Sequence, residues 1–131
     1  MIDIMNQPLS INDKVVIARQ YKLDIGEIIE TTSHEILVRL VSGVQLFVWP
    51  DHCYKYNDIL ACKELKAGDY VLRSIYYFGE HHLAIGMVSE VTNDKKYVAL
   101  RMNGYIESLV SVQDLFLIHE PHQTLLRLQG N

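Results

Sequence analysis

The stretch over residues 96–110 constrains the fold of this chain most strongly. Residues 97–102 have the composition of a β-strand, Asn103-Gly104 is a turn dipeptide, and residues 105–110 form a returning strand. An Asn-Gly pair can place both central residues at positive φ, as a type I′ hairpin requires. The sequence therefore predicts a tight β-hairpin at this position.

A second, less regular copy of this hairpin lies in the first half of the chain. There, residues 35–40 lead through Ser42-Gly43 into residues 44–48. Further pairs match at spacings of 56, then 60, then 63 residues, namely Asp13/Asp69, then Gly26/Gly86, Glu30/Glu90, Val38/Val98 and Leu40/Leu100, then Leu46/Leu109 and Asp51/Asp114. The spacing grows only at predicted loops, which tolerate insertions. We therefore interpret the chain as two copies of one β-module.

Each copy predicts the same order of elements. A strand is followed by a longer loop, a second strand, a turn, the hairpin, a helical turn and a short closing strand. In the first copy the longer loop covers residues 19–24, and Pro50 ends the hairpin because it lacks the N–H of a ladder hydrogen bond. We predict domains at residues 9–58 and 64–120, with a packed apolar connector between them. The C-terminal extension, residues 121–131, carries leucines that could cover one end of a module or pair with an edge.

The opening and the second strand of each copy carry a recognisable pattern. The residues are Asn12-Asp13-Lys14-Val15 with Gly26-Glu27-Ile28, and Gly68-Asp69-Tyr70-Val71 with Gly86-Met87-Val88. Over residues 11–118 this pattern resembles the SH3-like barrel superfamily, which includes Tudor, agenet and KOW modules. The resemblance implies an all-β fold of two tandem five-stranded SH3-like barrels. The glycine in the second strand also has a physical reason, because a small closed sheet bends sharply there.

Composition places the chain among ordinary globular proteins. Of its 131 residues, 49% are hydrophobic and 21% are charged. A module of about 55 residues buries only about 60% of its unfolded surface, so we expect the two modules to pack on each other. The apolar runs are far shorter than the ~20 residues of a membrane helix. Because no signal peptide is visible, we expect a cytoplasmic protein without membrane insertion.

The sequence contains no motif that indicates catalysis or metal binding. Cys53 and Cys62 fit no paired-ligand spacing, and no hydrolase elbow, phosphate loop or metalloprotease pair occurs. His81-His82 and His119-x-x-His122 could meet around a metal, but they fall in a predicted loop and in the tail. We interpret them as solvated histidines. We therefore predict a protein that is not an enzyme and that holds no cofactor and no metal.

Aromatic side chains are the candidates for ligand binding. Tyr76-Tyr77-Phe78 lie in the longer predicted loop of the second copy, and Tyr105 follows its Asn-Gly turn. The first copy has Tyr21 in its equivalent loop and Trp49 after its hairpin. The resemblance implies that this loop borders the ligand-binding end of each barrel. Aromatic side chains anchor interfaces at small entropy cost. We therefore expect these six residues to bind a protein partner, as in small regulators or phage-type host-modifying factors.

Two other ligand classes stay open, beside the alternative that the rings only pack in the core. A Tudor-like cage of rings would bind a methylated lysine or arginine. A KOW-like surface would bind nucleic acid or a transcription complex through basic residues and stacking tyrosines. The basic candidates form two groups, Lys14, Arg19 and Lys22, and Lys95, Lys96 and Arg101.

The overall charge of the chain argues against one class of nucleic-acid ligand, duplex DNA. The net charge is −4, from 12 Lys and Arg against 16 Asp and Glu. A general duplex-DNA binder gains its affinity by neutralising phosphates, so this balance argues against that class.

The oligomeric state stays open. An exposed strand edge could pair two chains, so both a monomer and a homodimer are compatible with the sequence.

Overall fold

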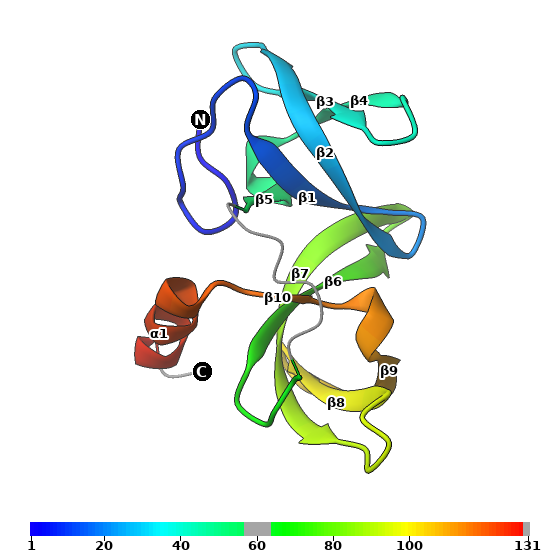
Figure 1. The fold of residues 1–131 in the computed structure, drawn as a ribbon. Helices are drawn as coiled ribbons and strands as arrows, with labels where there is room; N and C mark the ends of the chain where they lie inside the picture. The colour runs from blue at the N-terminus through cyan, green and yellow to red at the C-terminus, as the bar shows by residue number, and fades with distance from the viewer. Residues whose placement is uncertain (57–63, 130–131) are drawn as a thin grey trace. The chain divides into compact units, whose positions relative to one another are not determined.

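The computed structural model describes residues 1–56 and 64–129 of the chain (Figure 1). In this part of the chain, ten strands form two five-stranded sheets, and a single α-helix follows them. The strand order is β4-β3-β2-β1-β5 in one sheet and β10-β6-β7-β8-β9 in the other. The two orders are equivalent, element for element. The prediction of an all-β fold is confirmed.

The element bounds follow the predicted order closely. The first sheet contains β1 (Lys14–Arg19), β2 (Lys22–Thr31), β3 (Ile36–Leu40), β4 (Gln45–Val48) and β5 (Cys53–Lys55), with a 3-10 helix η1 at Pro50–His52. The second contains β6 (Tyr70–Tyr77), β7 (Glu80–Val91), β8 (Tyr97–Met102), β9 (Tyr105–Ser111) and β10 (Phe116–Leu117), with η2 at Val112–Asp114. The helix α1 spans Glu120–Leu128, a segment for which the sequence had predicted no helix.

The described residues form two compact units. The first unit consists of residues 1–56 together with residues 74–83, which are the tip of the β6–β7 hairpin. The second unit consists of residues 64–73 and 84–129. Residues 57–63 of the predicted connector, including Cys62, lie outside the described residues. A unit in space is therefore not the same set of residues as a copy in the sequence.

Hydrogen bonds at the start of the two sheets repeat atom by atom. The N–H of Ile28 donates to the carbonyl oxygen of Asp13 at 2.9 Å, and the N–H of Val88 donates to that of Asp69 at 2.8 Å. Each aspartate also accepts, on its carboxylate, the amide three residues before it. Both second strands have a bulge directly after this point. The predicted equivalence of the first two strands therefore agrees with the backbone.

The strand register corrects the predicted match in the later strands. Ile28 pairs with Val38, and Val88 pairs with Leu100. Val38 therefore corresponds to Leu100, 62 residues later, and not to Val98. A slip of two residues leaves every side chain on the same face of the strand. Alternation of apolar residues could not detect this error.

The predicted match in the fourth strand is wrong as well. Leu46 lies opposite Val38, whereas Leu109 sits at a bulge of β9 with a positive φ of 58°. The two 3-10 helices begin 62 residues apart, so Asp51 corresponds to Gln113 and not to Asp114. A bulge adds a residue without breaking the strand, so insertions are not confined to loops.

Both of the longer loops predicted after the first strands are two-residue hairpin turns. Their tips are Gln20-Tyr21 and Phe78-Gly79, with φ of 50°, 63°, 50° and 79°. Positive φ at both positions is the geometry of a type I′ turn. The extra residues of the second copy lengthen β6 and β7, which have 8 and 12 residues against 6 and 10 in β1 and β2.

The predicted type I′ geometry is absent at the Asn-Gly turn itself. Gly104 has a φ of 86°, but Asn103 is not among the residues with positive φ. A single positive φ at the second central position is the requirement of a type II turn. The hairpin forms as predicted, with a different turn.

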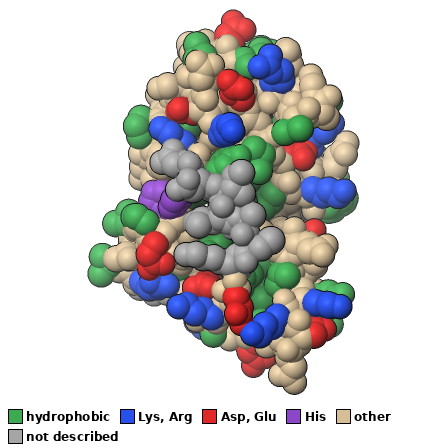
Figure 2. All heavy atoms as spheres, viewed as in Figure 1, with side chains coloured by type: hydrophobic (Ala, Val, Ile, Leu, Met, Phe, Trp, Pro, Cys, Tyr) green, Lys and Arg blue, Asp and Glu red, His purple; other side chains and the backbone are tan. Residues whose placement is uncertain are grey.

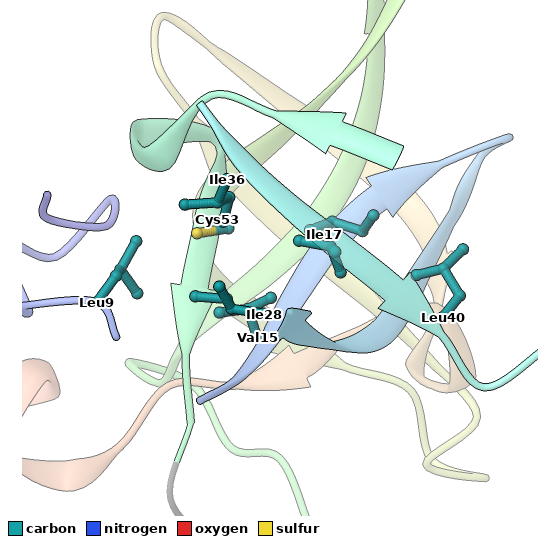
Figure 3. Packing of buried hydrophobic residues seen from close by; sticks show 8 residues of the cluster. Leu9, Val15, Ile17, Ile28, Ile36, Leu40 and Cys53 are labelled. Carbon is teal, nitrogen blue, oxygen red and sulfur yellow. The ribbon is translucent and has the colours of Figure 1, made fainter. Parts of the chain in front are cut away.

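The core of the first unit lies between its strands and the segment that precedes β1. Figure 3 shows its side chains pointing toward one another, and the cluster consists of Leu9, Val15, Ile17, Ile28, Ile36, Val38, Leu40 and Cys53. In β3 every second residue is buried, as expected for a strand with one face on the core. The second unit buries the corresponding apolar positions, among them Val88, Val98, Leu100, Met102 and Val110.

Candidate functional site

Three rings from distant parts of the sequence meet in the first unit. Tyr21 lies at the tip of the β1–β2 hairpin, Tyr76 lies near the end of β6, and His81 lies at the start of β7. The ring centroid of Tyr21 is 5.6 Å from that of Tyr76 and 4.5 Å from that of His81. The Tyr21 N–H also donates to Nδ1 of His81 at 3.2 Å. The ring cluster is therefore fixed by a backbone hydrogen bond.

A second set of rings continues from the same hairpin tip. The centroids of Tyr77 and Phe78 are 4.3 Å apart, and His82 lies 6.3 Å from Tyr77. His82 in turn lies 5.5 Å from His52 of η1, with the rings nearly perpendicular. Edge-to-face contacts of this kind are favourable because ring edges and ring faces carry opposite partial charges.

A cavity of about 300 Å³ is lined by one ring from each set, His81 and His52. Phe47 and Trp49 line one part of it, and Glu80 and His81 line another. Glu35 and His52 complete its polar lining. We call the rings of this cavity, together with the rings in contact with them, the aromatic surface; its members are Tyr21, Phe47, Trp49, Tyr76, Tyr77 and Phe78, with His52, His81 and His82.

Strand alternation explains why the rings on the β4 side face outward. Leu46 and Val48 pack against the core of the first unit. Phe47 and Trp49 occupy the alternate positions and are 57% and 54% exposed. The spacing of two between these aromatic residues was the signal that would have added Phe47 to the predicted site.

The structure brings five of the six predicted aromatic residues into one unit. Tyr21, Trp49, Tyr76, Tyr77 and Phe78 all belong to the aromatic surface, and each is exposed. Tyr105 is the exception because it begins β9 in the second unit, where it is 52% exposed. Sequence reasoning missed the three histidines, which it had interpreted as solvated or had not considered.

The basic residues do not form the two predicted groups. In the first group, Arg19 pairs with Lys22 at the tip of the β1–β2 hairpin, but Lys14 lies at the other end of β1, opposite Glu27. In the second, Lys95 and Lys96 precede β8, and Arg101 lies near its far end.

Acidic neighbours offset several of these cations. Arg19 lies 3.9 Å from Asp24, and Lys95 forms an ion pair with Glu64. Figure 2 shows basic and acidic side chains interspersed on the face that it presents. These positions do not form a continuous basic track for a phosphate backbone.

The histidines are divided between the units. His81 and His82 lie in the first unit, and His119 and His122 lie in the second. Among residues 1–56 and 64–129, no group of three or more His, Cys, Asp or Glu side chains is arranged to hold a metal ion.

Cys53 is fully buried in the core of the first unit. Burial, reinforced by the charges of Asp3 and Asp51, raises the pKa of its thiol to about 12. Its Sγ–H donates to the carbonyl oxygen of Pro50 at 3.1 Å. Because the nucleophile is the thiolate, a thiol in this state is chemically inert near neutral pH.

Alkylation should therefore modify Cys53 only in the unfolded chain. We expect iodoacetamide to leave Cys53 unmodified in the native protein at neutral and mildly alkaline pH, since both lie far below the raised pKa. In denaturant the same residue should react readily. Peptide mass spectrometry resolves the modification by site, and equal rates of modification in the two states would contradict the burial described here.

Comparisons with known proteins give no relative. No protein-family model matches the chain, and a search of curated proteins finds no match. The candidate site is therefore defined by its geometry.

In the described part of the chain, no helix has the length and apolar character needed to cross a membrane.

Proposed function

We propose that this chain is a non-enzymatic binding protein whose first unit contacts a partner protein through the aromatic surface. One observation carries the proposal: the exposed Phe47 and Trp49 line one cavity with His52 and His81. Ring contacts continue from His81 to the exposed Tyr21 and Tyr76, and from His52 through His82 to the exposed Tyr77. Isolated apolar side chains are common on protein surfaces, but large contiguous groups mark interaction sites. Tyrosine and tryptophan are also the residue types most enriched among interface hot spots.

Backbone strain at the hairpin tips supports this proposal. Tyr21 and Phe78 occupy the left-handed region, with φ of 63° and 50°. This conformation costs a residue other than glycine about 1–2 kcal/mol. Asn-Gly would form the same turns with less strain, so these aromatic residues contribute little to the turns themselves. Strained positions of this kind concentrate at functional sites.

The cavity gives the partner a place for an anchoring side chain. Its volume of about 300 Å³ is at the lower end of the range for ligand pockets, about 300–1,000 Å³. The exposed rings of Phe47 and Trp49 in its lining would exclude water from a side chain that enters it, as near-neutral contacts do around hot spots. Glu35 and Glu80 favour a neutral or basic side chain over an acidic one.

A reader of methylated lysine or arginine is the second candidate, and the lining of the same cavity favours it. Phe47 and Trp49 line the cavity together with the two acidic residues Glu35 and Glu80. Ring faces attract a cation that has lost part of its hydration. A partner whose binding requires methylation would select this second candidate.

Photo-crosslinking followed by affinity measurement tests the proposal. A photoreactive phenylalanine analogue at position 76 should crosslink a protein from cell extract, which mass spectrometry then identifies. Tyr76→Ala should weaken binding of that purified partner about 30-fold or more, the effect of a hot spot of about 2 kcal/mol. Tyr76→Phe should retain most of the affinity because it keeps the ring.

Tyr105→Ala provides the matched control. Tyr105 is 52% exposed and Tyr76 is 54% exposed, but Tyr105 lies outside the aromatic surface. We expect Tyr105→Ala to bind as the wild type does, with little dependence on salt in either protein. Equal losses for the two alanine variants would refute the site. A steep loss of affinity with added salt would instead indicate a nucleic-acid ligand.

A further inference from the structure

A second cavity lies entirely within the second unit. Its volume is about 630 Å³, well within the range of small-molecule sites. Strands β6, β7 and β8 and the helix α1 contribute its principal side chains, Tyr70, Ile85, Met87, Arg101, Met102 and Leu126. Among the described residues that line it, Arg101 is the one that carries a charge.

The equivalent arginine of the first unit has an acidic cross-strand partner that Arg101 does not have. Arg39 occupies the position in β3 that Arg101 occupies in β8. Arg39 pairs across the sheet with Glu27, and Nη2 of Arg39 lies 4.0 Å from Oε2 of Glu27. The cross-strand neighbour of Arg101 is Met87. The second copy therefore keeps the cation and replaces its carboxylate by a thioether.

The lining beside the exposed Arg101 combines Asn103 with adaptable apolar side chains. Met87 and Met102 are unbranched and polarisable, and such side chains fit ligands of varied shape. Leu126 of α1 adds an aliphatic wall.

The backbone is also more open here than in the first unit. A Cβ on Gly86 would lie 3.6 Å from the carbonyl oxygen of Arg101, whereas a Cβ on Gly26 would lie 2.9 Å from that of Arg39. At Gly86 the closest atom is instead Sδ of Met102, at 2.7 Å, so a flexible side chain occupies the space that β3 backbone and Val38 occupy beside Gly26.

We infer that this cavity binds a small amphipathic carboxylate. The carboxylate pairs with the guanidinium of Arg101, whose planar fork matches two carboxylate oxygens. The aliphatic chain lies against Met87, Met102 and Leu126, where it loses contact with water. The ligand thus supplies the acid that Glu27 supplies to Arg39 in the first unit. The inference is independent of the aromatic surface because no residue of the first unit takes part.

Octanoate is the probe for this inference, with methyl resonances of the methionines as the readout. Octanoate should shift the Met87 and Met102 methyl resonances in a saturable manner. Octanol and octylamine have the same chain without the negative charge, and they should bind about tenfold more weakly or not at all. Shifts that are equal for all three compounds, or no shift with octanoate, would overturn the inference. Binding of a short apolar peptide through its free C-terminus, without binding of octanoate, would overturn it also.

Three variants separate the role of charge from that of fold. Arg101→Gln should weaken octanoate binding about tenfold, whereas Arg39→Gln, at the equivalent position of the first unit, should leave it unchanged. Met87→Glu installs the carboxylate found at Glu27 and should abolish octanoate binding without lowering the melting temperature. Undiminished binding in Arg101→Gln or Met87→Glu would refute the assignment of Arg101 as the anion site.

Discussion

Replacing Gly26 by alanine is expected to destabilise the protein by about 3 kcal/mol, whereas Gly86→Ala should cost about 1 kcal/mol or less. A Cβ on Gly26 would lie 2.4 Å from Cγ1 of Val38 and 2.9 Å from the carbonyl oxygen of Arg39. The β-branched side chain and the backbone carbonyl cannot move aside without a shift of β3. At Gly86 the closest atom is Sδ of Met102 at 2.7 Å, and a methionine side chain can rotate away.

Urea unfolding measures the difference between these two glycines. The single tryptophan of the chain, Trp49, reports on the first unit by its fluorescence, and far-UV circular dichroism reports on both units. The Gly26→Ala transition should move to clearly lower urea, and the Gly86→Ala transition should stay near that of the wild type. Equal destabilisation would show that the two second strands approach their neighbours equally closely, contrary to the geometry.

Asp3→Ala is expected to cost about 3 kcal/mol, although the residue lies in a segment outside the sheets. Asp3 is only 2% exposed. Its Oδ1 accepts the amides of Met5 and Gln7 at 2.9 and 2.8 Å, and its Oδ2 accepts the amide of Lys55 at 2.6 Å. Alanine would leave these three backbone donors without their acceptor, and each unsatisfied buried donor costs about 1–3 kcal/mol.

Two further substitutions calibrate the Asp3 result. Asp3→Asn keeps one acceptor oxygen but turns an NH₂ group toward other donors, so its loss should be intermediate. Asp51→Ala removes a carboxylate that is 76% exposed and should change stability by about 0.5 kcal/mol or less. Thermal or urea unfolding ranks the three variants, and a loss for Asp3→Ala no larger than that for Asp51→Ala would disprove the role of this side chain.

The sequence predicted the strands well because their signals are local. Alternation of apolar residues, the Asn-Gly turn and Pro50 mark the strands and their ends within a few residues. The match of Gly26 with Gly86 agrees with the structure, in which each glycine lies two residues before the start of the bulge that the two copies share. The match of Val38 failed because a two-residue slip preserves both faces of a strand.

The turn type at the hairpin tips and the contacts within the aromatic surface could not be predicted from local sequence patterns. Gln20-Tyr21 and Phe78-Gly79 lack the residues that usually mark a type I′ turn, so the sequence predicted loops in their place. Tyr21 lies at its tip as expected, whereas Tyr76 and Tyr77, which were predicted in a loop, are the last two residues of β6. Their contact with His81, and the cavity beside Phe47, depend on contacts between residues far apart in the chain. No spacing within one segment encodes those contacts.

The division of the β6–β7 hairpin between the units has a consequence for how the protein can be made and cut. The tip of this hairpin, residues 74–83, belongs to the first unit, and its base belongs to the second. A fragment that stops at residue 56 would contain the first core without Tyr76 and His81. During synthesis, the aromatic surface stays incomplete until residues 74–83 have left the ribosome, so the partner binding proposed above would begin only after the start of the second copy has been made.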